Sequence, residues 1–241
     1  MAILFISDLH LSQERPDISQ LFLRFLQGPA RQAEALYILG DLFEVWLGDD
    51  MVLPDYGPAI SELKSLSETV PIFIMHGNRD FLLRADFEAM TGCRLLAEEV
   101  RIDLYGTPTL LMHGDTLCTD DVAYQQFRAM VRNPQWQTEL LSKTPAERLE
   151  LARKYREISK TETQGKQAGI MDVNPTAVEQ AMHRHHVQQL IHGHTHRPAI
   201  HDFQLAGQLA KRIVLADWYQ AGSMLVCEPT GCRLENMTLS N

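Results

Sequence analysis

The stretch that most constrains the fold is a short apolar run followed directly by a glycine and a carboxylate. Residues 36–39 are all apolar, which predicts a buried β-strand. Gly40 allows a tight turn at the end of that strand, and Asp41 comes next. In an open α/β sheet, ligands bind beyond the carboxyl ends of the strands. Because a carboxylate has two oxygen atoms and can bridge two cations, we interpret Asp41 as the centre of a metal site.

The same arrangement recurs at four other strand ends. Residues 3–6, 71–75, 109–112 and 187–191 are predicted strands, and each is followed closely by side chains that can bind a divalent metal. Taken singly, each of these side chains could equally belong to an ordinary turn or be a hydrogen-bonded structural residue. Their common position relative to a strand favours one shared site. The candidate metal ligands are Asp8, His10, Asp41, Asn78, His113, His194 and His196.

Helical patterns alternate with the first strands, which predicts βαβ units. Apolar spacing predicts helices over residues 18–27, 56–69 and 175–186, and short strands after residue 212 close a sheet. Between residues 119 and 172 the sequence shows no predicted strands and instead has long stretches with helical apolar spacing. The expected fold class is therefore α/β of the α+β type, with a core over residues 1–118 and 173–241 and a helical insertion over 119–172.

The helical insertion carries two apolar stripes, and it holds slightly more Lys and Arg than Asp and Glu. One interpretation is an ordinary helical hairpin packed on the core. The other is a lid that holds an amphiphilic or anionic substrate. The residue pattern alone does not separate the two. The stripes consist of Tyr124, Phe127, Met130 and Val131, and of Leu149, Ala152 and Tyr155.

The composition argues against several classes of protein. A chain of 241 residues that is 45% apolar can form a full core, and its net charge of −9 argues against binding along a nucleic acid. The apolar start, residues 1–6, is too short for a signal peptide, and no stretch approaches the roughly 20 apolar residues of a membrane span. We therefore expect a soluble protein that can still touch a membrane surface.

Other polar residues and the cysteines are expected to lie outside the site. Solvated positions are expected for the loop carboxylates Asp49 and Asp50 and for His183, His185 and His186 at a helix end. The cysteines form no C-x-x-C pair, which argues against a structural zinc site or a redox motif. Reduced thiols are therefore expected for Cys93, Cys118, Cys227 and Cys232.

The ordered motifs resemble those of the calcineurin-like metallophosphoesterases. The shared pattern is Asp-x-His, Gly-Asp, Gly-Asn-Arg-Asp, a lone His and Gly-His-x-His. The resemblance implies a two-sheet β-sandwich flanked by helices, with two divalent metal ions in the site. It implies that one ion is held by Asp8, His10, Asp41 and His196, and the other by Asp41, Asn78, His113 and His194.

Such a pair of ions suits phosphoester hydrolysis, because together they lower the pKa of a bound water and stabilise charge on the phosphoryl oxygens. The donor set offers only nitrogen and oxygen, so manganese, iron and zinc all fit it. Many relatives carry His directly after the metal-binding Asn, where it helps to protonate the leaving group. Arg79 occupies that position here and does not give up a proton, which favours a good leaving group such as a nucleoside monophosphate.

A longer set of motifs resembles the UDP-2,3-diacylglucosamine pyrophosphohydrolase family over nearly the whole chain. The similar segments are residues 37–50, 76–83, 112–121, 170–174 and 191–198. This resemblance implies hydrolysis of the pyrophosphate bond of UDP-2,3-diacylglucosamine to UMP and 2,3-diacylglucosamine 1-phosphate in lipid A biosynthesis, with manganese as the metal. It also implies that the insertion is a lid over the acyl chains. Peripheral contact with the cytoplasmic face of the inner membrane is expected, without an obligate protein partner.

The same resemblance implies roles for individual residues. It makes Asp41, Asn78, Arg79 and His194 catalytic. The implied substrate contacts are Asn78, Arg79, Asp121, Ser159, Lys166 and His194, with Tyr124 and Arg156 as additions and Thr163 where relatives often carry Asn. Two alternatives are another metallophosphoesterase acting on a soluble nucleotide or phosphodiester, and a non-catalytic scaffold on the same fold. The apolar stripes argue against the first, and the complete ligand set argues against the second.

Overall fold

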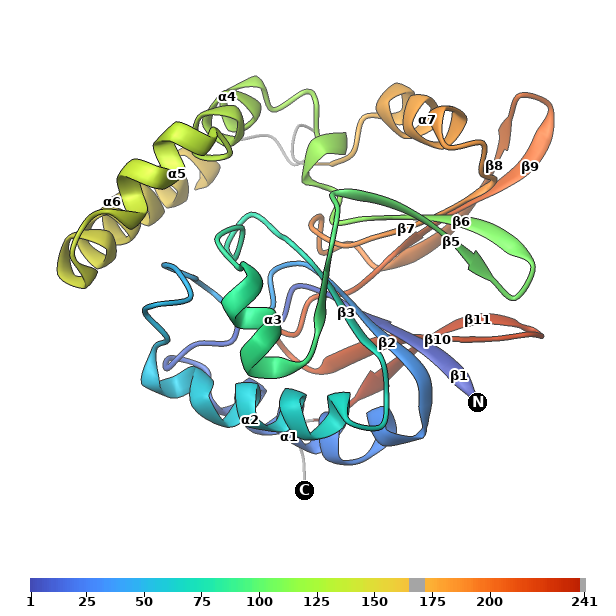
Figure 1. Ribbon diagram of the computed structural model, residues 1–241. Helices are drawn as coiled ribbons and strands as arrows, with labels where there is room; N and C mark the ends of the chain where they lie inside the picture. The colour runs from blue at the N-terminus through green and yellow to red at the C-terminus, as the bar shows by residue number, and fades with distance from the viewer. Residues whose placement is uncertain (165–171, 239–241) are drawn as a thin grey trace.

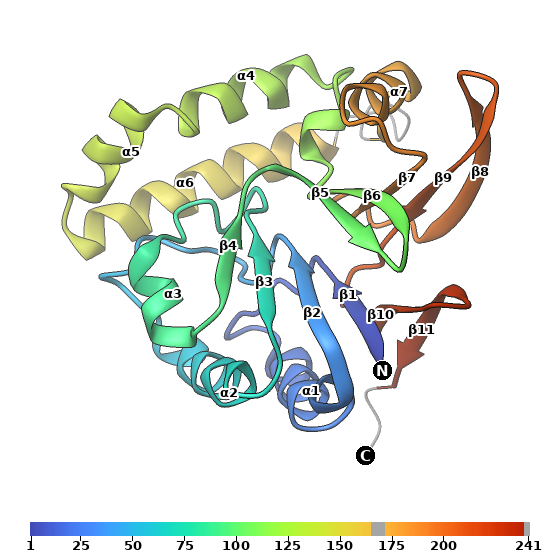
Figure 2. The ribbon, with the colours of Figure 1, turned by 45° about the vertical axis from the view of Figure 1, so that its right-hand side comes forward.

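Two β-sheets face each other at the centre of the molecule, and helices cover their outer faces (Figure 1, Figure 2). The computed structural model describes residues 1–164 and 172–238, without the side chains of residues 159–164. The two-sheet sandwich flanked by helices that the sequence predicted is confirmed.

The first sheet has the strand order β11-β10-β1-β2-β3-β4. The four strands β1 to β4 are parallel, and β10 and β11 continue the sheet antiparallel beside β1. These strands are β1 (Ala2–Ile6), β2 (Ala33–Leu39), β3 (Ile72–Met75), β4 (Arg94–Leu96), β10 (Gly222–Glu228) and β11 (Gly231–Met237). Its outer face is covered by α1 (Pro16–Gln27), α2 (Gly57–Ser67) and α3 (Ala85–Thr91), with the short helices η1 (Pro29–Gln32) and η2 (Pro54–Tyr56) between them.

The second sheet has the strand order β5-β6-β7-β9-β8, and β6, β7 and β9 run parallel in its centre. Its strands are β5 (Glu99–Leu104), β6 (Thr107–Met112), β7 (Gln189–His192), β8 (Ala199–Leu205) and β9 (Gln208–Val214). Helix α7 (Pro175–Arg184) packs on the outer face through Val178, Ala181 and Met182, which meet Leu110 and Leu190 of the sheet.

A row of aromatic rings fixes the register of the first three strands. Phe5, Tyr37 and Phe73 are paired across β1, β2 and β3. Their rings stack with centroid distances of 5.0 Å and 4.8 Å. Because cross-strand pairs of this kind stabilise one register, the strands end at nearly the same level. The residues that follow each strand therefore start from the same edge of the sheet.

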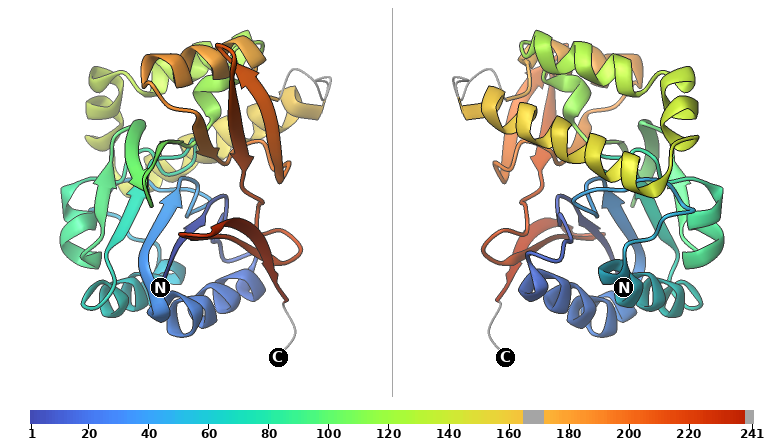
Figure 3. Two further views of the ribbon diagram at one scale, coloured as in Figure 1. Left: turned by 90° about the vertical axis from the view of Figure 1, so that its right-hand side faces the viewer. Right: turned by 90° about the vertical axis from the view of Figure 1, so that its left-hand side faces the viewer.

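Three helices between η3 (Asp115–Leu117) and α7 form a layer across one end of both sheets (Figure 2, Figure 3). They are α4 (Val122–Val131), α5 (Pro134–Leu141) and α6 (Pro145–Gln164). The side chain of Asp121 caps α4, and that of Asn133 caps α5, each by accepting a backbone N–H of the first turn. The helical insertion expected over 119–172 thus consists of three helices within its described part.

The strands that the sequence missed lie at sheet edges. β4 is one edge of the first sheet, while β5 and β8 are the two edges of the second. Edge strands are exposed on several sides, so they carry alternating polar residues instead of an apolar run. The sequences of β5 and β8, EVRIDL and AIHDFQL, show this alternation.

Two expectations for side chains outside the site are wrong. Cys227 and Cys232 face each other across β10 and β11 and form a disulfide, while Cys93 and Cys118 are free and buried. Direct antiparallel pairing brings two side chains close enough for this bond, although their sequence spacing fits no motif.

Asp49 is also not simply solvated. Its carboxylate accepts hydrogen bonds from Trp46 Nε1 at 2.9 Å and from the backbone N–H groups of Phe87 at 2.9 Å and Arg84 at 3.1 Å. It therefore caps α3. Asp50 is exposed as expected, but it pairs with the buried guanidinium of Arg148 in α6 at 2.6 Å. Of the three histidines, His183 and His186 are exposed, and His185 is half-buried and pairs with Glu99.

In the part of the chain that the structure describes, no helix combines the length and apolar character that crossing a bilayer requires.

Asp49→Ala should destabilise the protein by about 2 kcal/mol, because it removes a helix cap and leaves the Trp46 indole N–H without its acceptor. For a chain of this size the melting temperature should fall by roughly 4–8 °C, which calorimetry can measure. The control is Asp55→Ala, since Asp55 is an exposed carboxylate in the neighbouring short helix η2. Equal melting temperatures for the two variants would contradict the capping role.

Candidate metal centre

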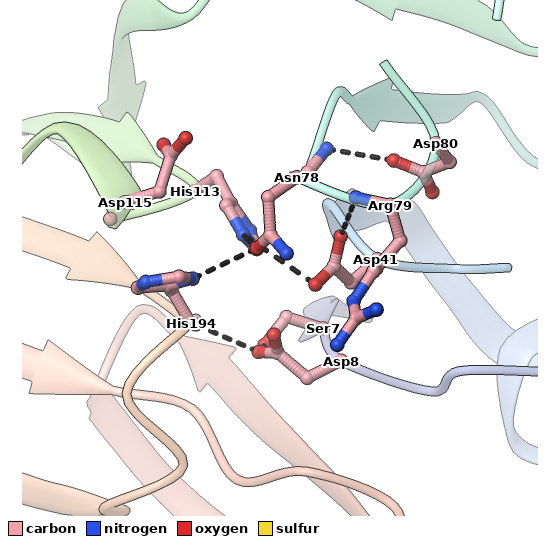
Figure 4. A network of polar contacts seen from close by, with 12 residues as sticks. Ser7, Asp8, Asp41, Asn78, Arg79, Asp80, His113, Asp115 and His194 are labelled. Atoms are coloured by element: carbon pink, nitrogen blue, oxygen red, sulfur yellow. Dashed lines mark hydrogen bonds and ion pairs between the residues drawn. The ribbon is translucent and has the colours of Figure 1, made fainter. Parts of the chain in front are cut away.

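Loops from both sheets converge on one group of polar side chains (Figure 4). Asp8, Asp41 and Asn78 follow β1, β2 and β3 of the first sheet, and His113 and His194 follow β6 and β7 of the second. His10 and His196 complete the group. The structure therefore brings all seven predicted metal ligands together.

Three of the five ligand-bearing loops, those after β1, β2 and β7, share an unusual backbone conformation. Left-handed φ angles occur at Asp8 (55°), His10 (50°), Asp41 (53°), His194 (67°) and His196 (55°). Residues with side chains rarely adopt this region, and such strain clusters at functional sites. The left-handed turn bends each loop sharply at the ligand.

Two glycines let the loops approach the carboxylates. A Cβ atom on Gly77 would lie 2.1 Å from Asp41 Oδ1, and one on Gly193 would lie 2.4 Å from Asp8 Oδ2. Any side chain at either position would push the loop away from the carboxylate. These glycines therefore permit the close contact between the loops that carry Asp41 and Asn78, and between those that carry Asp8 and His194.

The carboxylate of Asp41 lies in the middle of the group. Its Oδ2 atom is 3.8 Å from His10 Nε2 and 3.8 Å from His113 Nε2, and its Oδ1 atom accepts the backbone N–H of Arg79 at 2.8 Å. One carboxylate oxygen thus faces two imidazoles on different sides. This is the placement that a bridging ligand between two cations requires.

On one side of Asp41, three ligand atoms converge. Asn78 Oδ1 lies 3.1 Å from His113 Nε2 and 3.0 Å from His194 Nδ1. His113 donates its Nδ1–H to the backbone carbonyl of Leu39 at 2.8 Å. Against the opposing effect of burial, Asp41 and Asp8 raise the pKa of His113. In the neutral form of His113, the bond to Leu39 leaves the Nε2 lone pair facing the site, which is the usual way a metal-binding imidazole is oriented. Burial and the neighbouring His113 lower the pKa of His194 to about 4, so its imidazole is neutral at pH 7.

On the other side, Asp8, His10 and His196 form a second group. The carboxylate and imidazole ligand atoms of these three residues lie within 4.8 Å of one another, as do those of Asp8, Asp41 and His113. Asp8 is therefore a member of both of these three-residue clusters. The sequence motifs predict that only Asp41 is shared between the two metal ions.

Several atoms of this group fit a bound cation. Asp8 Oδ1 and the His10 ring nitrogens are buried, and none of them makes a hydrogen bond of good geometry among the described residues, although His196 and Glu44 lie within ion-pair distance of them. Burial raises the pKa of Asp41 even though His113 and His10 oppose that shift. Buried polar atoms without partners are costly, and carboxylates with imidazoles and an amide suit a divalent metal. The donor set thus fits the divalent metal ions that the sequence predicted.

Residues that the sequence reading did not assign hold the ligands in place. Glu44 Oε2 lies 3.2 Å from His10 Nδ1, and Asp217 Oδ2 lies 2.9 Å from His196 Nδ1. Burial opposes the charged form of His196, but the hydrogen bonds to Asp217 and Asp8 outweigh it and raise the pKa of His196 to about 10. Glu44 lies three residues after Asp41, so proximity to a ligand was an available signal, whereas nothing local marks Asp217.

Asp80 supports the loops from inside. Its carboxylate accepts the backbone N–H groups of Leu42 and Gly77, each at 2.8 Å. Leu42 follows Asp41 and Gly77 precedes Asn78, so one buried side chain ties the two ligand loops together.

Helix α4 and the residue that follows it are attached to the loops that carry Asn78 and His113. Arg132 donates to the carbonyl of Gly77 at 2.9 Å, and Arg128 Nε donates to Asp115 at 2.6 Å. The Tyr124 hydroxyl donates to Asp115 at 2.9 Å, and its ring lies 5.7 Å from that of His194. Burial and Asp115 raise the pKa of Tyr124 well above its usual range, so its hydroxyl stays protonated.

The predicted substrate contacts are placed unevenly. Asn78, Tyr124 and His194 lie together, and the side chain of Arg79 reaches Glu44 at 3.5 Å. Arg156 of α6 also pairs with Glu44, at 2.9 Å, and Asp121 caps α4. The side chains of Ser159 and Thr163, and the whole of Lys166, lie outside the described residues.

A cavity of about 560 Å³ opens beside the metal centre, between the core and helices α4 to α6. Its polar part includes Asn78, Arg79, Arg156 and Glu44, together with further Arg and Glu side chains. Most of the remaining wall is apolar and includes Phe81, Phe127, Val131, Trp136, Leu140, Leu149, Ala152 and Tyr155. Both apolar stripes of the insertion therefore contribute to this wall, although Met130 is exposed instead.

Comparison with known proteins identifies the class of protein that this fold and site define. Residues 1–198 match the calcineurin-like phosphoesterase family. A solved structure described as a novel archaeal phosphodiesterase shares the fold, with a TM-score of 0.51 and 12% identity over 98% of this chain and 100% of that one. The protein is thus a calcineurin-like phosphoesterase.

Closer relatives identify the family more narrowly. The Klebsiella pneumoniae protein named UDP-2,3-diacylglucosamine hydrolase is 53% identical over 235 residues, which cover 97% of this chain and 98% of its own. A Stenotrophomonas maltophilia protein of the same name is 49% identical over 245 residues, or 98% of this chain and 99% of its own. The chain therefore belongs to the UDP-2,3-diacylglucosamine hydrolase family, as its motifs predicted.

Glu44→Gln should lower the affinity for the metal ion that His10 helps to bind by about tenfold or more. Residues that orient a metal ligand commonly contribute 10–100-fold to metal affinity. Competition with a chelator, followed by measurement of bound metal, tests this. An ion held by Asn78, His113 and His194 should keep its affinity. Glu68→Gln is the control, since Glu68 is exposed at the end of α2. Unchanged metal affinity in Glu44→Gln would refute the role given to Glu44.

Proposed function

We propose that this protein hydrolyses the pyrophosphate bond of UDP-2,3-diacylglucosamine to give UMP and 2,3-diacylglucosamine 1-phosphate, a step of lipid A biosynthesis. The observation that carries the proposal is the apolar cavity beside the metal centre. A substrate with two acyl chains and a charged diphosphate needs an apolar pocket and a polar catalytic site side by side. The names of the two bacterial relatives support the same substrate.

The metal centre proposed here holds two divalent ions, with manganese as the expected metal. Asp8, His10, Asp41 and His196 hold one ion, and Asp41, Asn78, His113 and His194 hold the other. Bound there, the ions would supply Lewis acidity and a water of lowered pKa. The nitrogen and oxygen donors, without any thiolate, support a metal of this kind.

The surrounding residues position the diphosphate. Arg79 directs a permanent positive charge toward Glu44, and its buried Nε has no hydrogen-bond partner among the described residues. A diphosphate oxygen would satisfy that donor. Because a guanidinium does not release its proton, Arg79 stabilises charge and does not act as a general acid. Asp41, Asn78, Arg79 and His194 are the residues we propose for catalysis.

The helical insertion, residues 119–172, acts as a lid over the acyl chains in this proposal. The apolar faces of α4 and α6 line the cavity, with Phe127 and Val131 on one helix and Leu149 and Ala152 on the other. A soluble nucleotide or a simple phosphodiester has no group to fill this space. The alternative of a phosphoesterase for soluble substrates is therefore less well supported.

Hydrolysis of UDP-2,3-diacylglucosamine in oxygen-18 water, with and without manganese, tests the reaction. We expect metal-dependent formation of UMP and 2,3-diacylglucosamine 1-phosphate, with the label on only one of them as read by mass spectrometry. Asp41→Ala serves as the control and should lose turnover together with bound metal. If the chain cleaved UDP-glucose or a simple diester but left the lipid substrate intact, the proposal of a metal centre would be supported and the proposed substrate would be contradicted.

Ala152→Phe should lower kcat/KM for the lipid substrate by about tenfold, because displacing two methylene groups from the cavity costs roughly 1.6 kcal/mol. Hydrolysis of bis-p-nitrophenyl phosphate should stay within about twofold of the unmodified protein. The matched control is Ala146→Phe, since Ala146 lies on the same helix but is exposed. Equal effects on both substrates would show that the cavity does not hold the acyl chains.

We also propose peripheral contact with the cytoplasmic face of the inner membrane through the insertion. Val122, Met130 and Ile158 are large apolar residues that are 61%, 41% and 46% exposed on α4 and α6. Arg153 and Lys154 are exposed on α6 and suit anionic lipid.

Sedimentation with anionic vesicles should therefore pellet the protein at low salt and less at high salt. Met130→Ser with Ile158→Ser should reduce pelleting, whereas Leu209→Ser, which changes an exposed apolar residue of β9, should not. Absence of lipid-dependent pelleting would count against this contact.

A further inference from the structure

An exposed aromatic side chain lies against the metal centre but outside the cavity. The Tyr219 ring is 5.9 Å from the His10 ring, nearly parallel to it at 26°, and 5.8 Å from the His196 ring. Tyr219 is nevertheless 49% exposed, and it is not among the described residues that line the cavity. An exposed aromatic ring beside two candidate metal ligands is placed to contact part of a ligand that binds at the metal centre.

The loop that carries Tyr219 is held firmly. The preceding residue, Trp218, is buried against Phe22 and Phe25, and its backbone N–H donates to Asp8 O at 3.1 Å. On the exposed side, Arg15 Nη2 donates to the carbonyl of Tyr219 at 2.6 Å. The ring is therefore exposed on an ordered frame, which lowers the entropic cost of binding.

The guanidinium of Arg15 lies 6.0 Å from the centre of the Tyr219 ring. Arg15 also pairs with Asp17 at 2.9 Å, which holds its side chain in place. An aromatic ring beside a planar cation is a combination that binds nucleobases in many proteins, because both present flat faces to the base. Both residues come from segments that the sequence reading left without a function.

The shape of the proposed substrate indicates which part of it would bind at this surface. The inference therefore rests on the proposed function. The diphosphate must lie at the metal centre, with a lipid on one side and a nucleoside on the other. The cavity under α4 to α6 takes the lipid side. The nucleoside must therefore leave the centre by another face, and Tyr219 is the exposed aromatic residue next to His10 and His196.

We propose that Tyr219 and Arg15 form the nucleoside subsite, in which the pyrimidine base packs against the Tyr219 ring. The base is what the subsite distinguishes, because the phosphate of any such ligand would lie at the metal centre. Tyr219 thereby favours substrates that carry a nucleobase over diphosphates that carry none. It is a specificity-determining residue and takes no part in bond cleavage.

Binding of two probes to the manganese-loaded protein tests this subsite without turnover. Isothermal titration calorimetry would compare UMP with ribose 5-phosphate, which lacks the base. Tyr219→Ala should lower the affinity for UMP by about tenfold, which lies within the range measured for stacking of one base. The affinity for ribose 5-phosphate should fall by less than about twofold. Tyr219→Phe keeps the ring and should recover most of the lost UMP affinity. Leu209→Ala changes an exposed apolar residue elsewhere and should affect neither probe.

The outcomes separate a base contact from a structural role. Equal weakening of both probes, or loss of metal from Tyr219→Ala, would mean that Tyr219 only supports His10 and His196, and would overturn the subsite. An unchanged UMP affinity would overturn it as well. If the unmodified protein failed to hydrolyse UDP-2,3-diacylglucosamine but still bound UMP through Tyr219, the subsite would stand and the proposed lipid substrate would fall.

Discussion

The buried carboxylates of Asp8 and Asp41 are the constraint on which the other features of the site depend. Neither is exposed by more than 2%, and two further acids, Glu44 and Asp217, stand directly behind the histidines that face them. Burying so much negative charge without a cation would be strongly destabilising. Left-handed turns, close glycine contacts and the level strand ends of two sheets all serve to bring these carboxylates within reach of the same imidazoles.

The sequence predicted those features of the site that depend on positions close together along the chain. Each candidate metal ligand lies one to four residues after the end of a strand, so the hydrophobic pattern predicted the positions of Asp41, Asn78 and His113 relative to their strands. Glu44 and Asp217 were missed because their role depends on which ring nitrogen they meet, a distance that only the folded chain sets. The edge strands were missed because exposure removes the apolar run that marks a central strand. The division into core and lid and the assigned roles of the site residues stay predictions.

The identities of the ligands and their backbone conformation are linked. Asp, Asn and His are the residues with side chains that most readily adopt left-handed φ angles, and they are also the preferred ligands of divalent ions bound through oxygen and nitrogen. Five of the seven candidate ligands combine the two properties. The local strain is compensated by the surrounding fold, for example by Asp80, which ties two of the loops through backbone N–H groups.

The helical layer is linked to the metal centre through contacts with the ligand loops. Helix α4 and the residue after it contact the loops that carry His113 and Asn78, through Arg128 and Arg132. The start of α6 is fixed by the buried Arg148, and further along the helix Arg156 pairs with Glu44. The carboxylate of Glu44 is buried and also lies against His10. Any movement of α6 that breaks this ion pair therefore changes the surroundings of a candidate metal ligand.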